Sequence, residues 1–138
     1  MNDNTIHNIE SDPESALMLQ WTLQEQGFQV HVSNDFIDAA GFLKKNKPTL
    51  IVSDLMKNEK TTALDFYIHH VMKKSIPFAL VSDTFAYLPS STSFGRDALN
   101  PQFGTLCLQP YNLNLPCFEK PFDVGHILLH FQMLSAAL

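Results

Sequence analysis

The sequence predicts an α/β fold, in which helices cover both faces of a parallel β-sheet. Short runs of strand length, at residues 5–9, 49–53 and 78–82, alternate with stretches whose apolar residues have helical spacing. Polar side chains stand where these runs end, as functional groups do in open α/β sheets. The length of 138 residues, with 45% hydrophobic and 17% charged residues, is typical of a single globular domain over residues 1–138.

The first strand is expected at residues 5–9, and a helix is expected from 13 to about 26. Polar cap candidates precede this helix, a proline lies in its first turn, and Gly27 is suited to end it. Its expected apolar stripe consists of Leu17, Trp21 and Leu23. Residues 28–32 alternate apolar and polar side chains, which predicts the second strand.

A second helix is expected after the capping segment 33–35. Its buried face is expected to contain Phe36, Ala39, Ala40 and Leu43. The third strand follows at 49–53, and a polar loop then leads to a third helix over about 63–74. Residues 78–82 complete the regular part as the fourth strand.

Residues 83–116 show no clear period, so we expect an irregular segment with helix only near 96–100. Aromatic residues are expected to anchor this segment to the rest of the protein: Phe85, Tyr87, Phe94, Phe103 and Tyr111. A short fifth strand is expected at 117–119, and Asp123 is expected to cap a final helix to about 134.

Composition excludes several classes of protein. The net charge is −5, and the nine basic residues form no run longer than a pair, so no nucleic-acid partner is expected. The N-terminus is polar and acidic, unlike a signal peptide, and no apolar stretch is long enough to span a membrane. Cys107 and Cys117 match no common zinc spacing, and we expect them to be reduced in a cytoplasmic protein.

Four polar side chains end the predicted strands in a specific order. Glu10 follows the first strand, and Asp54 follows the apolar run of the third. Ser82 ends the fourth strand, and Lys120 follows the fifth. Because parallel strands bring their carboxyl ends to one edge of a sheet, these four side chains are expected to converge.

Four segments together resemble the receiver domain of response regulators in two-component signalling: IESDPES, LIVSDLM, IPFALVSD and CFEKPFD. The resemblance covers the chain except for residues 84–116. It implies a flavodoxin-like three-layer α/β/α sandwich with five parallel strands in the order 2-1-3-4-5, and an irregular segment in place of the fourth helix.

The resemblance also implies roles for individual residues. Asp54 would accept a phosphoryl group. Magnesium would be held by Glu10, Asp54 and the carbonyl of Met56. Ser82 would hydrogen-bond the phosphoryl group, and Lys120 would neutralise it. These residue types suit the chemistry, because a carboxylate that attacks a phosphorus donor needs its negative charge cancelled by a metal and a cation.

The chain departs from the family pattern at several positions. Ser11 stands where the family usually has a second acid at the metal, so it is a weak replacement ligand and magnesium affinity should fall. Asp83 stands beside Ser82, where the family prefers a small residue. Cys117 takes the place of the usual switch aromatic. Ser11 is also interpreted as the helix cap that follows the first strand.

These departures leave two functions open. One is a receiver that is phosphorylated on Asp54 and signals through protein contacts, with no enzymatic activity beyond its own phosphorylation and dephosphorylation. The other is a pseudo-receiver that signals without phosphate. A flavodoxin-like enzyme or nucleotide binder is the weakest alternative, because none of the five glycines forms a G-x-G motif.

The implied partners are a sensor histidine kinase or a phosphotransfer protein, and a downstream protein. Neither nucleic acid nor a membrane is expected as a direct partner. A second copy of the chain, in a homodimer, is left open.

Overall fold

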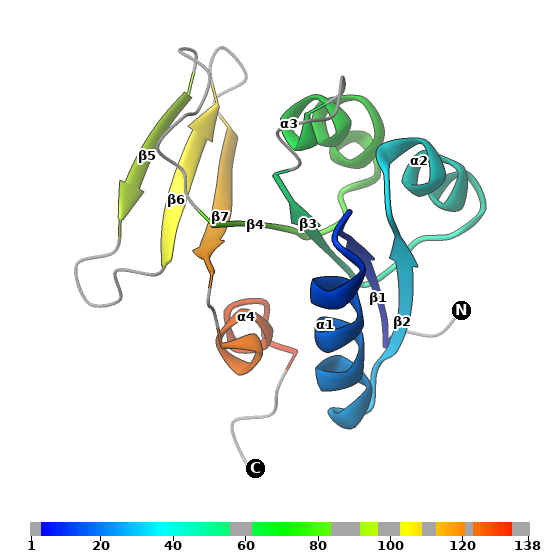
Figure 1. Ribbon diagram of the computed structural model, residues 1–138. Helices are drawn as coiled ribbons and strands as arrows, with labels where there is room; N and C mark the ends of the chain where they lie inside the picture. Colours follow the sequence, from blue (N-terminus) through cyan, green and yellow to red (C-terminus); the bar gives the residue numbers. More distant parts are fainter. Residues whose placement is uncertain are drawn as a thin grey trace. The chain divides into compact units, whose positions relative to one another are not determined.

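The structure is a computed structural model that describes residues 4–55, 62–83, 92–96, 103–108, 113–120 and 123–133. It contains two compact units, Met1–Phe78 and Ala79–Leu138 (Figure 1). Whether residues 1–138 act as the single domain expected from the sequence stays a prediction.

The first unit contains three parallel strands in the order β2-β1-β3. Their bounds are Thr5–Ile9 for β1, Gln29–Ser33 for β2 and Leu50–Asp54 for β3. Strand β1 lies between its two neighbours, and its Ile6 and Ile9 are completely buried. This part of the predicted strand order is confirmed.

Helices α1 (Pro13–Glu25) and α2 (Phe36–Lys45) each begin at an aspartate. The Asp12 carboxylate accepts a hydrogen bond from the backbone of Ser15 at 2.9 Å, and Asp35 accepts one from the backbone of Asp38 at 2.7 Å. The expectation that Ser11 caps the first helix was therefore wrong. Proline is favoured at the first position of a helix, so the residue directly before Pro13, which is Asp12, becomes the cap.

The two helices lie on opposite faces of the sheet (Figure 1). The side chain of Asn8 donates to the carbonyl of Ala16 on α1 at 3.4 Å. The ring of His31, on the other face, stacks on Phe42 of α2 with centroids 3.9 Å apart. His7 pairs with His31 across the strands, and successive strand residues point to opposite faces. This arrangement confirms that helices cover both faces of this sheet.

The buried face of α1 differs from the expected stripe. Ala16 and Leu23 are buried, whereas Leu17 and Trp21 are 41% and 57% exposed. Six helical positions separate Leu17 from Leu23, a rotation of about 240°, so these two residues cannot share one face. Burial in α2 agrees better with the sequence, since Phe36, Ala39 and Leu43 are buried as expected.

The third helical segment is continuous but changes its hydrogen-bonding pattern. It consists of α3 (Ala63–Phe66), a π-helical turn η1 (Tyr67–Val71) and a 3₁₀ turn η2 (Met72–Lys74). Ser75 ends it in the left-handed conformation with φ of 56°. The expected bounds of 63 and 74 are confirmed. The segment packs against α2 through the stacked rings of Phe36 and Phe66, whose centroids are 5.0 Å apart.

Strand β4 (Phe78–Ser82) begins at the last residue of the first unit and continues into the second. The other strands of the second unit are β5 (Thr92–Arg96), β6 (Phe103–Leu108) and β7 (Leu113–Glu119), and their order is β4-β7-β6-β5. Strand β7 pairs with β4 in parallel, as expected of the predicted fifth strand, and pairs with β6 in antiparallel fashion.

The expected irregular segment was wrong in part, because β5 and β6 form an antiparallel pair. Arg96 ends a strand and does not begin a helix. The remainder of the helix expected near 96–100 lies outside the described residues. The first half of β7 was not expected from the sequence, because it contains Pro116 and a proline argues against a central strand. The register of β4 with β7 begins only at Cys117, so Pro116 faces one ladder partner, Thr105 of β6.

Helix α4 (Val124–His130) packs on β6 and β7 through aromatic contacts. Its cap is Asp123, as expected, which accepts from the backbone of Gly125 at 2.9 Å. The rings of His126 and His130 lie 5.1–6.0 Å from those of Phe103 and Phe118. Phe103 is therefore one of the anchors that the sequence predicts. Burial, and then the neighbouring His126, lower the pKa of His130.

The cysteines are not joined by a disulfide. Cys117 is buried, and burial raises the pKa of its thiol to about 12. The Cys107 thiol donates to the Asn114 side chain at 3.0 Å. No helix among the described residues is long and apolar enough to cross a membrane.

A histidine pair lies between the sheet and α2, with His7 in the core and His31 half-buried. His7 is completely buried, and its Nε2 is 2.8 Å from the hydroxyl of Ser33. Its Nδ1 has no hydrogen-bond partner, and the same holds for Nε2 of His31. Burial, reinforced by the charge of His31, lowers the pKa of His7 to about 3, although Asp38 acts in the opposite direction.

The histidine pair generates a prediction about stability and pH. The unfolded chain binds a proton to His7 near pH 6.5, whereas the folded protein binds it only near pH 3. Stability contributed by neutral His7 is therefore complete above pH 6.5, and it should fall by up to about 1.4 kcal/mol per pH unit as the pH decreases below that value. Urea unfolding between pH 7 and pH 5 measures this slope.

The matched variant is His7→Phe combined with Ser33→Ala, which replaces both hydrogen-bond partners by apolar groups. Its free energy of unfolding should depend less steeply on pH than that of the wild type. Equal slopes for the two proteins would contradict the role of His7.

The cap assignment generates a second prediction. Asp12→Ala should decrease the free energy of unfolding by about 1 kcal/mol, because it removes the cap of α1. Ser11→Ala, at the neighbouring exposed position, should change it by less than about 0.5 kcal/mol. Urea denaturation at pH 7 compares the two variants, and a larger loss for Ser11→Ala would restore the cap expected from the sequence.

Candidate functional site

Glu10 directly follows β1 and is buried, with 6% of its surface exposed. Two hydrogen bonds hold its backbone. Its N–H donates to the carbonyl of Ser33 at 2.9 Å, and its carbonyl accepts from the Asn34 side chain at 3.1 Å. Its carboxylate accepts a hydrogen bond from the backbone of Asp12 at 3.2 Å. The side chain is thus fixed near the start of α1, where a negative charge is also favoured by the helix dipole.

Ser11 and Asp12, the two residues after Glu10, differ in their environment. Ser11 is exposed, and the carboxylate of Asp12 is engaged as the cap of α1. The carboxylate next to Ser11 is therefore engaged at the start of the helix. Ser11 contributes a neutral hydroxyl where the family pattern has a carboxylate.

Asp54 is the last residue of β3 and is half-buried. The parallel register pairs Ile9 with Ser53, so Glu10 and Asp54 occupy equivalent positions one residue further along neighbouring strands. Alternation along the strands puts Glu10 on the face of Asn8, and Asp54 on the face of Val52, which is the partner of Asn8. Both carboxylates therefore belong to the same face at the same end of the sheet.

This carboxylate pair has donor chemistry suitable for Mg²⁺. The ion prefers hard oxygen ligands and is commonly bound through one or two carboxylates with several retained waters. The carbonyl of Met56, expected as a further ligand, lies outside the described residues. Within the described parts of the chain, no group of three or more histidine, cysteine or acidic side chains could hold a metal. The donor set thus fits Mg²⁺ with fewer charged ligands than the family pattern provides.

Ser82 and Lys120 belong to the second unit. Ser82 ends β4 and is buried, and Lys120 follows β7 and is half-buried. The register pairs Ser82 with Glu119, and the backbone N–H of Lys120 donates to the carbonyl of Ser82 at 2.8 Å. The structure therefore brings the hydroxyl residue and the lysine to the same end of two adjacent parallel strands.

The predicted site residues thus form two pairs, each at the carboxyl end of neighbouring strands: Glu10 with Asp54, and Ser82 with Lys120. Asp83 is exposed directly after Ser82. Asn34 was missed from the sequence as a residue that supports the site. Its only signal in the sequence is its position after the second strand, within the expected capping segment 33–35.

The sequence matches no family model and no curated protein. Comparison with solved structures, in contrast, finds many similar folds. CheY4 of Vibrio cholerae has a TM-score of 0.68 at 17% identity, with 97% of this chain and 100% of that chain covered. The CheY-like receiver domain from Methylobacillus flagellatus has a TM-score of 0.67 at 18% identity, with 97% and 100% covered.

The response regulator TrrA from Thermotoga maritima, whose structure is a complex with Mg²⁺ and BeF, has a TM-score of 0.68 at 14% identity. The match covers 95% of this chain and 99% of that chain. These similarities extend over nearly the whole length of the sequence. This chain therefore has the flavodoxin-like, CheY-like fold of response-regulator receiver domains.

Proposed function

We propose that this chain is a receiver domain that accepts a phosphoryl group on Asp54 and transmits the change through contacts with other proteins. The observation that carries the proposal is the pairing of Glu10 and Asp54 at the ends of adjacent parallel strands, in a chain with the receiver fold. The phosphoryl donor would be a sensor histidine kinase or a phosphotransfer protein.

In the proposed reaction, a carboxylate oxygen of Asp54 attacks the phosphorus atom of the donor. A new O–P bond forms, and the bond from phosphorus to the leaving group breaks, with its electron pair departing on the donor. Two nearby carboxylates repel each other by about 4 kcal/mol at 4 Å and an effective dielectric of 20, and they also repel the incoming anion. Glu10 beside Asp54 therefore makes a cation necessary.

Mg²⁺ would be held by Glu10 and Asp54, and when bound it would supply the neutralising charge. TrrA, which shares the fold, binds Mg²⁺ together with BeF, and this supports the proposal. The roles of Ser82 as hydrogen-bond donor and of Lys120 as the cation beside the phosphoryl group rest on the sequence resemblance. The reaction makes the chain a phosphoacceptor, with no catalysis beyond its own phosphorylation and dephosphorylation.

A pseudo-receiver that signals without phosphate is the second candidate. It is favoured by Ser11, which supplies no charge to a metal, and by the exposed Asp83 beside Ser82. An additional negative charge next to the phosphoryl-binding hydroxyl would oppose binding of an anion. The following measurements separate the two candidates.

Incubation with acetyl phosphate and Mg²⁺, followed by intact-mass measurement, should add the mass of one phosphoryl group to the wild type. Asp54→Asn should remove this addition, because the amide cannot form an acyl phosphate. Asp65→Asn, an equivalent change at an exposed position on α3, should retain it. No modification of the wild type, or modification that persists in Asp54→Asn, would reject phosphorylation at Asp54 and favour the pseudo-receiver.

The departure at Ser11 generates a further prediction. Ser11→Asp should bind Mg²⁺ about tenfold more tightly than the wild type, because it adds the carboxylate that the family pattern places at the metal. Ser11→Asn, of nearly the same size but uncharged, should leave the affinity within about twofold of the wild type. Isothermal titration calorimetry measures both dissociation constants, and equal affinities for the two variants would show that residue 11 does not face the ion.

A further inference from the structure

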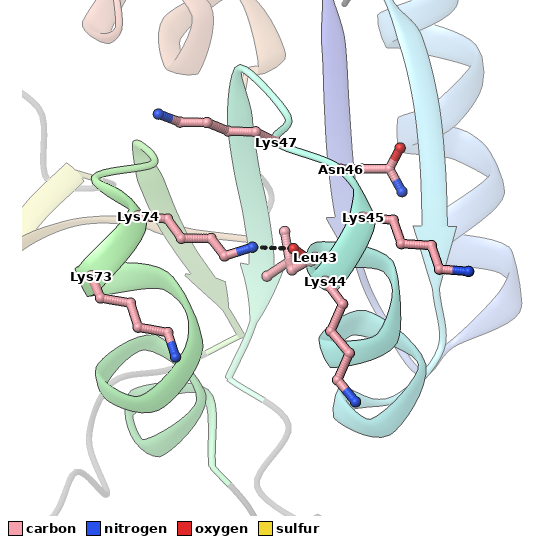
Figure 2. A pocket seen from close by; sticks show the side chains of 7 residues that line it. All are labelled: Leu43, Lys44, Lys45, Asn46, Lys47, Lys73 and Lys74. Atoms are coloured by element: carbon pink, nitrogen blue, oxygen red, sulfur yellow. Dashed lines mark hydrogen bonds between the residues drawn. The ribbon is translucent and has the colours of Figure 1, made fainter.

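A cluster of lysines surrounds an open, shallow pocket of about 460 Å³ in the first unit (Figure 2). This lysine pocket is lined by Leu43, Lys44, Lys45, Asn46, Lys47, Lys73 and Lys74. Lys44 and Lys45 come from the last turn of α2, and Lys73 and Lys74 come from η2. Two helical segments far apart in the sequence thus bring their basic C-terminal turns together.

Helix termini explain part of this arrangement. Basic side chains are favoured near the negative end of a helix dipole. The amine of Lys74 also donates to the carbonyl of Leu43, which ties η2 to the end of α2 (Figure 2). Lys47, however, lies beyond the end of α2, and no hydrogen bond of this kind accounts for Lys44 or Lys73 among the described residues. The helix dipoles therefore do not account for all of the positive charge in the cluster.

The concentration of charge is unusual for this chain. Five of its nine basic residues line the lysine pocket, although the whole chain has 14 acidic residues and a net charge of −5. No acidic side chain lines it. Among the described residues, no ion pair within 4.0 Å joins a carboxylate to these lysines.

The pKa of His70 reflects the positive charge of the lysine pocket. Its pKa is lowered first by burial and then by the charges of Lys73, His69, Lys44 and Lys74. No acidic residue is among the groups that act on it. Three of the pocket lysines therefore act on the same neighbouring ring without a compensating negative charge.

We propose that the lysine pocket binds a short acidic segment of a partner protein, rich in aspartate and glutamate. The open shape suits a peptide that lies across a surface, whereas small-molecule sites usually enclose most of their ligand. The apolar stems of the lysines supply contact area below the charged amines. Charge complementarity of this kind gives specificity and accelerates association.

Nucleic acid and anionic membranes fit the lysine pocket less well. Its lining contains neither arginine for bidentate contacts nor an aromatic ring for base stacking. A long polyanion or a charged bilayer would also meet the acidic remainder of this protein, whereas a short segment would contact the lysines alone.

The position of the lysine pocket separates it from the phosphoacceptor. Residues 43–47 precede β3, whereas Asp54 ends that strand. Five strand residues span roughly 16 Å, so a partner bound here leaves the Asp54 end of the first unit accessible. The proposal therefore does not depend on phosphorylation, and its test is independent of that reaction.

Fluorescence anisotropy with a fluorescein-labelled octaglutamate peptide tests the proposal on the full chain. Lys44→Gln combined with Lys73→Gln should weaken binding about tenfold, because two exposed lysines lose their charge. The matched control is Gln24→Glu with Gln29→Glu, which changes the net charge equally at exposed positions elsewhere in the first unit. This control should weaken binding less than about twofold.

Two further probes identify the class of partner: a labelled single-stranded DNA and phosphatidylserine vesicles. Tighter binding of the peptide than of either probe, with loss in the lysine variant alone, supports the proposal. Absence of peptide binding, or equal weakening in the control, would overturn it. Tighter binding of the DNA or the vesicles through the same lysines would also overturn it, in favour of that partner. Circular dichroism confirms that each variant remains folded.

Discussion

The parallel register of β1 between β2 and β3 determines which side chains meet in the first unit. It pairs His7 with His31 on one face and places Glu10 beside Asp54 on the other. Side chains alternate along a strand, so a slip of one residue would turn every member of β1 to the opposite face. The same backbone pairing thus fixes both the packing around α2 and the carboxylate pair.

Strand β1 and the residue that follows it bury three polar side chains. His7, Asn8 and Glu10 each have a partner: the hydroxyl of Ser33, the carbonyl of Ala16 and the backbone of Asp12. Burying such groups without partners would cost several kcal/mol. The partners come from β2, α1 and the turn between β1 and α1, so these polar contacts help to define how the elements assemble around β1.

Sequence patterns predicted the elements whose signals are local. Strand-length apolar runs gave β1, β3 and β4, aspartates marked the starts of α2 and α4, and Gly27 marked the end of α1. The strand ends also indicated the two residue pairs of the candidate site. The patterns failed where the outcome depends on distant partners. Pro116 concealed the first half of β7, before the strand expected at 117–119. The exposed side of α1 could not be recognised from the apolar character of Leu17 and Trp21.

The two thiols, Cys107 on β6 and Cys117 on β7, differ in their accessibility to labelling reagents. Maleimides react with the thiolate, and burial with a pKa near 12 leaves Cys117 almost entirely protonated at neutral pH. Cys107, half-exposed on β6, is the accessible thiol of the native chain. A spin label or dye can thus be attached at a single defined point without first mutating a cysteine, and that point reports on the β-hairpin that the receiver motifs did not predict.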